Sequence, residues 1–153
     1  MPAQPPAPRR PTDLLNGELS TDGIARLTLT GVAPRPAHVG YVRHQIRLVL
    51  QLWGLTDLTP PAEILISELA TNVVRHARTR FTITVSWDRL TLRVEVSDAS
   101  PLAPRPQLTG HTDDEDGRGL LLVAAIATDW GVDLSPRGKT VWFTIRRYSY
   151  DPW

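Results

Sequence analysis

The sequence predicts an α+β domain, because stretches with the twofold period of a strand are mixed with stretches of helical period. Residues 81–87 and 90–97 alternate apolar and polar side chains around the short connection Asp88-Arg89. This pattern is typical of an antiparallel hairpin with one covered face. Residues 37–53, and the segment that follows Pro60-Pro61, carry apolar residues at helical spacing. The length of 153 residues suits one domain with its own core.

The other elements follow in order along the chain. Residues 1–12 are rich in proline and lack an apolar pattern, so residues 1–19 are expected to form a disordered tail before the domain at 20–148. A strand is expected at 24–29, and Gly54 suits the end of the first helix. After the hairpin we expect a loop over 99–117, a short apolar helix over 119–128, a strand over 141–147 and a C-terminal tail at 149–153.

Composition excludes several classes of function. The formal net charge of +1 provides no overall field that would attract nucleic acid or a membrane surface. The chain has no cysteine, so it has neither disulfides nor thiolate metal sites. The N-terminus lacks the apolar core of a secretory signal, and no apolar run reaches membrane-spanning length. We therefore expect a cytoplasmic protein.

A carboxylate and a carboxamide lie one helical turn apart in the second predicted helix. Glu68 and Asn72 are four residues apart, so their side chains lie one above the other on the helix surface. They fall outside the apolar stripe that ends at Ala77, and so face either solvent or a cleft. Two oxygen atoms aimed at one point suit a magnesium ion that also binds water and phosphate. A solvated helix face is the alternative interpretation.

Asp98 ends the second strand of the hairpin with the same parity as its apolar residues. The twofold period places its carboxylate on the covered face, where it needs a backbone amide, an arginine or a ligand donor. The exocyclic amine of a purine is one such donor. An Asx turn before Ala99-Ser100-Pro101 is the alternative.

Two glycine-containing segments complete the candidate residues. Gly117-Arg118-Gly119 opens the predicted third helix, where a bare backbone and free N–H groups favour a phosphate, unless it is only a flexible hinge. Gly138-Lys139-Thr140 precedes the last strand. Thr140 would offer a hydroxyl to a base, or would simply open the strand after a turn.

In this order, the motifs resemble those of the GHKL (Bergerat-fold) ATPase superfamily. The closer similarity is to its anti-sigma factor and serine-protein kinase branch of actinobacterial type, a histidine kinase-like ATPase domain. The resemblance covers roughly residues 20–147. The matching segments are the N box at Glu68–Ala77, the first G box at Val96–Pro101, the second at Gly117–Val123 and the terminal strand at Gly138–Phe143.

The resemblance implies a two-layer α/β sandwich, with a mixed, mostly antiparallel sheet and helices on one face. It also implies a role for each residue. Asn72 resembles the magnesium ligand, and Glu68 resembles the acidic residue that assists phosphoryl transfer. Asp98 resembles the acceptor of the adenine amine, and Thr140 a second contact near the base. The lid hinge over the phosphates corresponds to Gly117 and Gly119, with Arg118 between them among the nucleotide-binding residues.

The function implied is that of an ATP-binding regulator that uses ATP and Mg²⁺. It would be an anti-sigma factor with serine/threonine-protein kinase activity toward a STAS-type antagonist, with a sigma factor as the other partner and a homodimer as the assembly. The alternative is a non-catalytic switch that binds a sigma factor or a STAS protein. It is motivated by Ser100-Pro101, because the usual first G box has a glycine two residues after the aspartate. A fragment of a histidine kinase is a third, less favoured interpretation.

Overall fold

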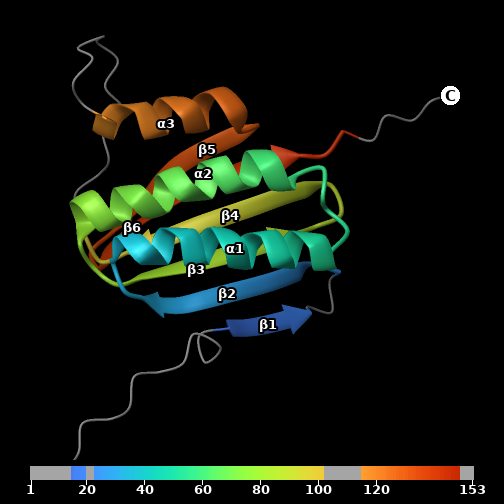
Figure 1. Cartoon of the computed structure of the whole chain (residues 1–153), viewed down its shortest axis with the longest axis horizontal. Coiled ribbons are helices and arrows are strands. Elements are labelled where there is room, and N and C mark those ends of the chain that lie inside the picture. Colours follow the sequence, from blue (N-terminus) through green and yellow to red (C-terminus); the bar gives the residue numbers. More distant parts are fainter. Residues whose placement is uncertain (1–14, 20–22, 102–114, 149–153) are drawn as a thin grey trace, which may run out of the picture.

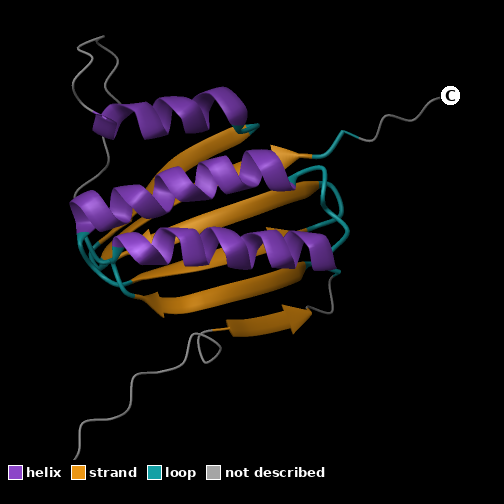
Figure 2. Cartoon of the chain, in the orientation of Figure 1, coloured by secondary structure: helices purple, strands orange, loops and turns teal. Residues whose placement is uncertain are grey.

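In the computed structural model, three helices lie on one face of a six-stranded sheet (Figures 1 and 2). The structure describes residues 15–19, 23–101 and 115–148, and at 15–19 and 115–118 it describes the backbone alone. Along the described chain the elements are β1 (Leu15–Leu19), β2 (Ala25–Val32), α1 (Pro36–Leu52), α2 (Thr59–Asn72), the π-helical turn η2 (Val73–Ala77), β3 (Phe81–Trp87), β4 (Thr91–Asp98), α3 (Glu115–Ile126), β5 (Asp129–Ser135) and β6 (Gly138–Arg146). None of the described helices is long and apolar enough to span a bilayer.

The predicted two-layer α+β fold is confirmed, although the described sheet is antiparallel throughout rather than mixed. The spatial order of the strands is β1-β2-β3-β4-β6-β5, and every described pair is antiparallel. Adjacent strands are consecutive in sequence, except that β4 pairs with β6 while α3 and β5 are inserted between them. The sheet therefore joins two distant parts of the chain along the β4–β6 seam.

The predicted hairpin is formed by β3 and β4. Asp88 closes it, because its Oδ1 accepts hydrogen bonds from the backbone N–H groups of Leu90 and Thr91 at 2.9 and 2.7 Å. Arg89 takes the left-handed conformation with φ of 78°. The turn fixes the register in which Phe81 lies opposite Asp98. This register places the predicted base-binding residue at the end of β4.

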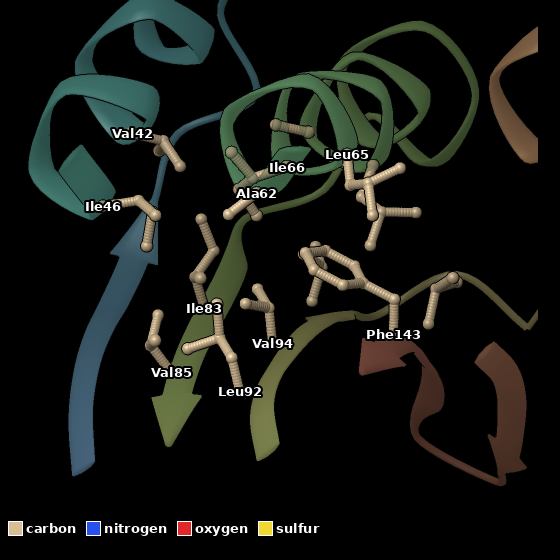
Figure 3. Close-up of a cluster of buried hydrophobic side chains, with 14 of the residues drawn as sticks. Val42, Ile46, Ala62, Leu65, Ile66, Ile83, Val85, Leu92, Val94 and Phe143 are labelled. Carbon is tan, nitrogen blue, oxygen red and sulfur yellow. The ribbon is translucent and has the colours of Figure 1, made fainter. Parts of the chain in front are cut away.

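The hydrophobic core lies between the helices and the sheet. Figure 3 shows side chains of α1 and α2 pointing toward those of the strands. Ile66 of α2, Ile46 of α1 and Phe143 of β6 have no exposed surface. Burial of each such side chain contributes about 1.5–3 kcal/mol. The core thus holds α2, which carries Glu68 and Asn72, firmly against the centre of the sheet.

Three elements differ from the sequence prediction. Leu15–Leu19, assigned to the disordered tail, instead form β1, which pairs with β2. Helix α3 begins at Glu115 instead of residue 119, since acidic residues are favoured in a first helical turn. Strand β5 was not predicted. Residues 1–14 and 149–153 of the predicted tails lie outside the described residues.

The face of the sheet opposite the helices carries polar side chains and one tryptophan. The guanidinium of Arg93 lies 4.2 Å from the ring centroid of Trp142 and pairs with Glu95 at 2.8 Å. A β-carbon at Gly131 would lie 2.6 Å from the Trp142 ring. The absence of a side chain at Gly131 in β5 therefore makes room for the Trp142 ring on this face.

Candidate functional site

Glu68 and Asn72 face helix α3, as the prediction of a cleft-facing pair allowed. Both side chains are half-buried. A β-carbon at Gly119 would lie 2.7 Å from Oε2 of Glu68 and 3.7 Å from Nδ2 of Asn72. The first of these distances is shorter than any normal contact, so a side chain at position 119 would have to displace the Glu68 carboxylate. The structure therefore brings together three of the residues predicted from sequence.

The three residues form a cradle with specific chemistry. Glu68 contributes a carboxylate and Asn72 a carbonyl oxygen, and both are hard oxygen ligands of the kind that Mg²⁺ prefers. Gly119 contributes a bare backbone, which permits close approach of a ligand. No group of three or more His, Cys, Asp or Glu side chains among the described residues is placed to hold a metal. The cradle fits a magnesium ion that is delivered with a phosphate-bearing ligand.

Asp98 lies on the helix-covered face at the end of β4, so its predicted inward orientation is confirmed. Its Oδ1 accepts the backbone N–H of Ser100 at 2.8 Å, which is the Asx-type contact proposed as an alternative. The Lys139 ammonium lies 3.1 Å from Oδ1 and 3.0 Å from Oδ2. The Asp98 side chain is only 1% exposed and that of Lys139 only 8%. A backbone amide and a lysine together satisfy this carboxylate.

Gly138 allows β6 to begin directly beside the end of β4. Its φ is +147°, and a β-carbon there would lie 1.9 Å from the carbonyl oxygen of Asp98. No other residue fits this position without moving the backbone. Lys139 consequently enters the ladder directly opposite Asp98.

Thr140 is not brought to the Asp98 carboxylate. It lies opposite Ser97 in the ladder, and the two hydroxyls share a hydrogen bond of 2.7 Å on the uncovered face. Side chains alternate along a strand, so adjacent residues point to opposite faces. The strand-opening role offered as the alternative describes Thr140 better than a contact with the base.

Lys139 is the functional candidate that sequence reasoning missed. The signal was present, because Val141, Phe143 and Ile145 were predicted to share one face of the last strand. The same parity, counted back by two, places residue 139 on that face. If the strand is taken to begin at Gly138, its twofold alternation predicts that Lys139 is buried on the same face as Asp98.

Gly117 and Gly119 lie inside the first two turns of α3 rather than before it. The predicted hinge is therefore part of a continuous helix in this structure. The side chain of Arg118 lies outside what the structure describes. The ends of α2 and β4 and the beginnings of α3 and β6 lie at the same end of the molecule (Figure 1). The cradle and the Asp98–Lys139 pair are thus held at one end of the sandwich.

A comparison with protein-family models decides the family. The model described as a histidine kinase-like ATPase domain matches residues 32–145, which is more than half of the chain. The chain belongs to the histidine kinase-like ATPase family. A comparison with curated proteins found no match.

The histidine kinase-like ATPase domain spans every site residue named above. The match begins at the last residue of β2 and ends one residue before the end of β6, so β1 precedes it. Membership of this family supports ATP binding as the general function of the chain. The cradle of Glu68, Asn72 and Gly119 fits that function. The Asp98 carboxylate fits it only if a ligand donor replaces the Lys139 ammonium, which contacts both carboxylate oxygens.

Proposed function

We propose that this histidine kinase-like ATPase domain is an anti-sigma factor with serine/threonine-protein kinase activity toward a STAS-type antagonist. The observation that supports the proposal is the close approach of the Gly119 backbone to the Glu68 and Asn72 side chains, which lie between α2 and α3. The resemblance of four ordered motifs to the anti-sigma branch supports the choice of partner. ATP with Mg²⁺ would supply the phosphoryl group when bound.

Glu68 and Asn72 would divide the chemistry. Asn72 would hold the metal through its carbonyl oxygen, since an amide oxygen is a hard ligand that carries no charge of its own. Glu68 would accept the proton of the attacking serine hydroxyl, or orient that hydroxyl toward the phosphorus. Positioning and charge neutralisation account for most of the catalysis in phosphoryl transfer. The rigid support of α2 by the core serves that positioning.

Asp98 would read the base. A carboxylate at a buried strand end accepts an N–H donor and excludes a base that lacks one, because a buried acceptor left unpaired is costly. Gly138 keeps the two strand ends together, so the acceptor is held on a rigid part of the sheet. This arrangement supports selection of a 6-aminopurine such as adenine.

The direct test is transfer of the γ-phosphate from radiolabelled Mg-ATP to a serine of a STAS protein from the same genome. We expect transfer by the wild type and a loss of about 100-fold or more in rate for Glu68→Gln, since a positioned base contributes about 10²–10⁴-fold. Glu63→Gln is the matched control, because Glu63 lies on the same helix but pairs with Arg47 of α1. Absence of transfer to every STAS partner, with Mg-ATP bound normally, would refute the kinase.

A non-catalytic switch is the second candidate, and a specific observation favours it. Asp98 is already satisfied within the protein by Lys139 and Ser100, so the base site is closed without a ligand. In that case nucleotide, if bound at all, would only shape a surface for the sigma factor or STAS partner. Glu68→Gln would then leave repression of a sigma-dependent reporter unchanged in cells, whereas the kinase predicts altered repression.

A further inference from the structure

Lys139 is the only lysine in the chain. Lysine and arginine together number 17, and every other one is arginine. Among the described cationic side chains, this single lysine is the buried one, with 8% of its side chain exposed. Lysine presents a compact ammonium on a flexible stem, whereas arginine presents a larger planar fork. The only lysine of the chain is therefore paired with Asp98, the carboxylate that is predicted to bind the base.

The Asp98 carboxylate is nearly closed by its internal partners. Oδ1 accepts from Ser100 and Lys139, and Oδ2 lies 3.0 Å from the same ammonium. An ionised carboxylate has about four acceptor positions, so a further donor has room only at Oδ2. With 1% of the side chain exposed, that position is covered as well. The Lys139 ammonium therefore occupies acceptor positions on both oxygens of Asp98 that the amine of a base would need.

We propose that Lys139 is an internal competitor for the base, holding Asp98 in the free protein and leaving it when a 6-aminopurine nucleotide binds. The inference rests on the proposed function, because it assumes that Asp98 reads the base. The flexible stem allows the ammonium to move away, while Gly138 fixes the backbone from which it moves. Lys139 thereby lowers the affinity of the protein for ATP. It leaves Asp98 only when the ligand has an amine that can donate to the carboxylate in its place.

A ligand without the amine behaves differently. Purine riboside triphosphate has the same ring and phosphates as ATP but no donor to replace the ammonium. It would leave the Asp98–Lys139 pair intact, since separating a buried pair without compensation is strongly unfavourable. Removal of Lys139 should therefore improve the binding of ATP and leave the binding of purine riboside triphosphate nearly unchanged.

The test combines two changes, removal of the Lys139 ammonium from the protein and removal of the 6-amino group from the ligand. Calorimetric titration gives the dissociation constants of Mg-ATP and Mg-purine riboside triphosphate for each protein variant. In Lys139→Met we expect the ratio of the two dissociation constants to shift in favour of ATP by about tenfold or more. Arg137→Met is the matched control. It removes the same charge from an exposed residue two positions earlier, and its ratio should equal that of the wild type.

Two outcomes of the titration overturn the inference. If wild type and Lys139→Met bind ATP with the same selectivity, Lys139 does not compete, although the proposed function survives. If neither binds Mg-ATP, the competitor and the proposed ATP-dependent function fail together. Binding by Lys139→Met but not by the wild type supports competition in its strongest form.

Lys139→Met leaves Asp98 without its cation and could unfold, so a milder variant and a wild-type measurement accompany it. Lys139→Gln retains a neutral NH₂ donor group and should shift selectivity in the same direction by a smaller factor. Nitrogen-15 labelling of lysine gives a single side-chain ammonium signal in the wild type, because the chain has one lysine. Saturating Mg-ATP should move or remove this signal, while purine riboside triphosphate should not. A signal unchanged by saturating ATP would overturn the inference.

Discussion

The backbone of Gly119 lies so close to Glu68 that a β-carbon at position 119 would be 2.7 Å from the carboxylate oxygen Oε2. The neighbouring atom is the end of a flexible side chain, so it can move aside. A substitution at position 119 should therefore displace the Glu68 side chain while changing the stability of the fold little. This separation of function from stability makes the contact experimentally useful.

Gly119→Ala should weaken Mg-ATP binding or phosphoryl transfer by about tenfold or more, because a displacement of about 1 Å in an active site is costly. Its free energy of unfolding should change by no more than about 1 kcal/mol, since alanine is the better helix former. Titration calorimetry and urea unfolding measure the two effects. Gly40→Ala in α1 is the control, because its β-carbon would meet only Arg43 at 3.8 Å. Equal binding by the two variants would contradict the role of the contact.

Gly138→Ala should destabilise the protein by about 3 kcal/mol or more, because the new β-carbon would meet the Asp98 carbonyl at 1.9 Å in a conformation that L-residues rarely adopt. Urea unfolding measures the loss. Gly54→Ala is the control that measures the cost of the left-handed backbone conformation without a steric clash. Gly54 has φ of +71°, but a β-carbon there would have no atom within 4 Å. Gly54→Ala should cost about 1 kcal/mol. A loss at Gly138 no larger than that at Gly54 would mean that the strand ends separate easily.

Asp98→Ala should cost about 3–5 kcal/mol in the free energy of unfolding, because it leaves the Lys139 ammonium buried without a partner. The double variant Asp98→Ala/Lys139→Met should recover most of that loss, since no buried charge remains. Asp57→Ala is the comparison, because its pair with Arg147 is 39–48% exposed and exposed pairs contribute about 0–1 kcal/mol. Additive losses in the double variant would contradict a coupled pair.

Asn72→Ala should abolish the effect of magnesium on ATP affinity while leaving metal-free ATP binding nearly unchanged. The physical reason is that the amide oxygen is the proposed metal ligand, and removing it leaves the Asp98 end of the site intact. Calorimetric titrations with MgCl₂ and with EDTA measure the effect. Thr71→Ala, one residue earlier and also half-buried, is the control. Retention of the full magnesium effect would assign the metal to another residue.

The sequence was most informative where periodicity and tertiary packing agree. The alternation in β3 and β4 predicted both strands and the inward carboxylate of Asp98. The spacing of Glu68 and Asn72 predicted a shared direction, but only the structure shows that Gly119 is what they face. The parity of β6 places Lys139, rather than Thr140, on the same face as the Asp98 carboxylate.

Other features depend on contacts that no local pattern encodes. Gly131, the third residue of β5, lowers its strand propensity, and glycine is needed there because of the Trp142 ring from the neighbouring strand. Strand β1 is short and lies at the edge of the sheet. The π-helical turn after Asn72, which ends with Arg78 in the left-handed conformation, is too rare to predict from sequence.

The β4–β6 seam has a consequence for how the protein is made. Asp98 and Lys139 are separated by 41 positions, so β4 leaves the ribosome before its partner strand exists. At about 5–20 residues per second, the nascent chain carries this strand end for a few seconds without its cation. The two strands of the β3–β4 hairpin and both α1 and α2 precede that point in the chain. The end of the sheet that holds Asp98 is therefore completed late in translation, when the only lysine is added.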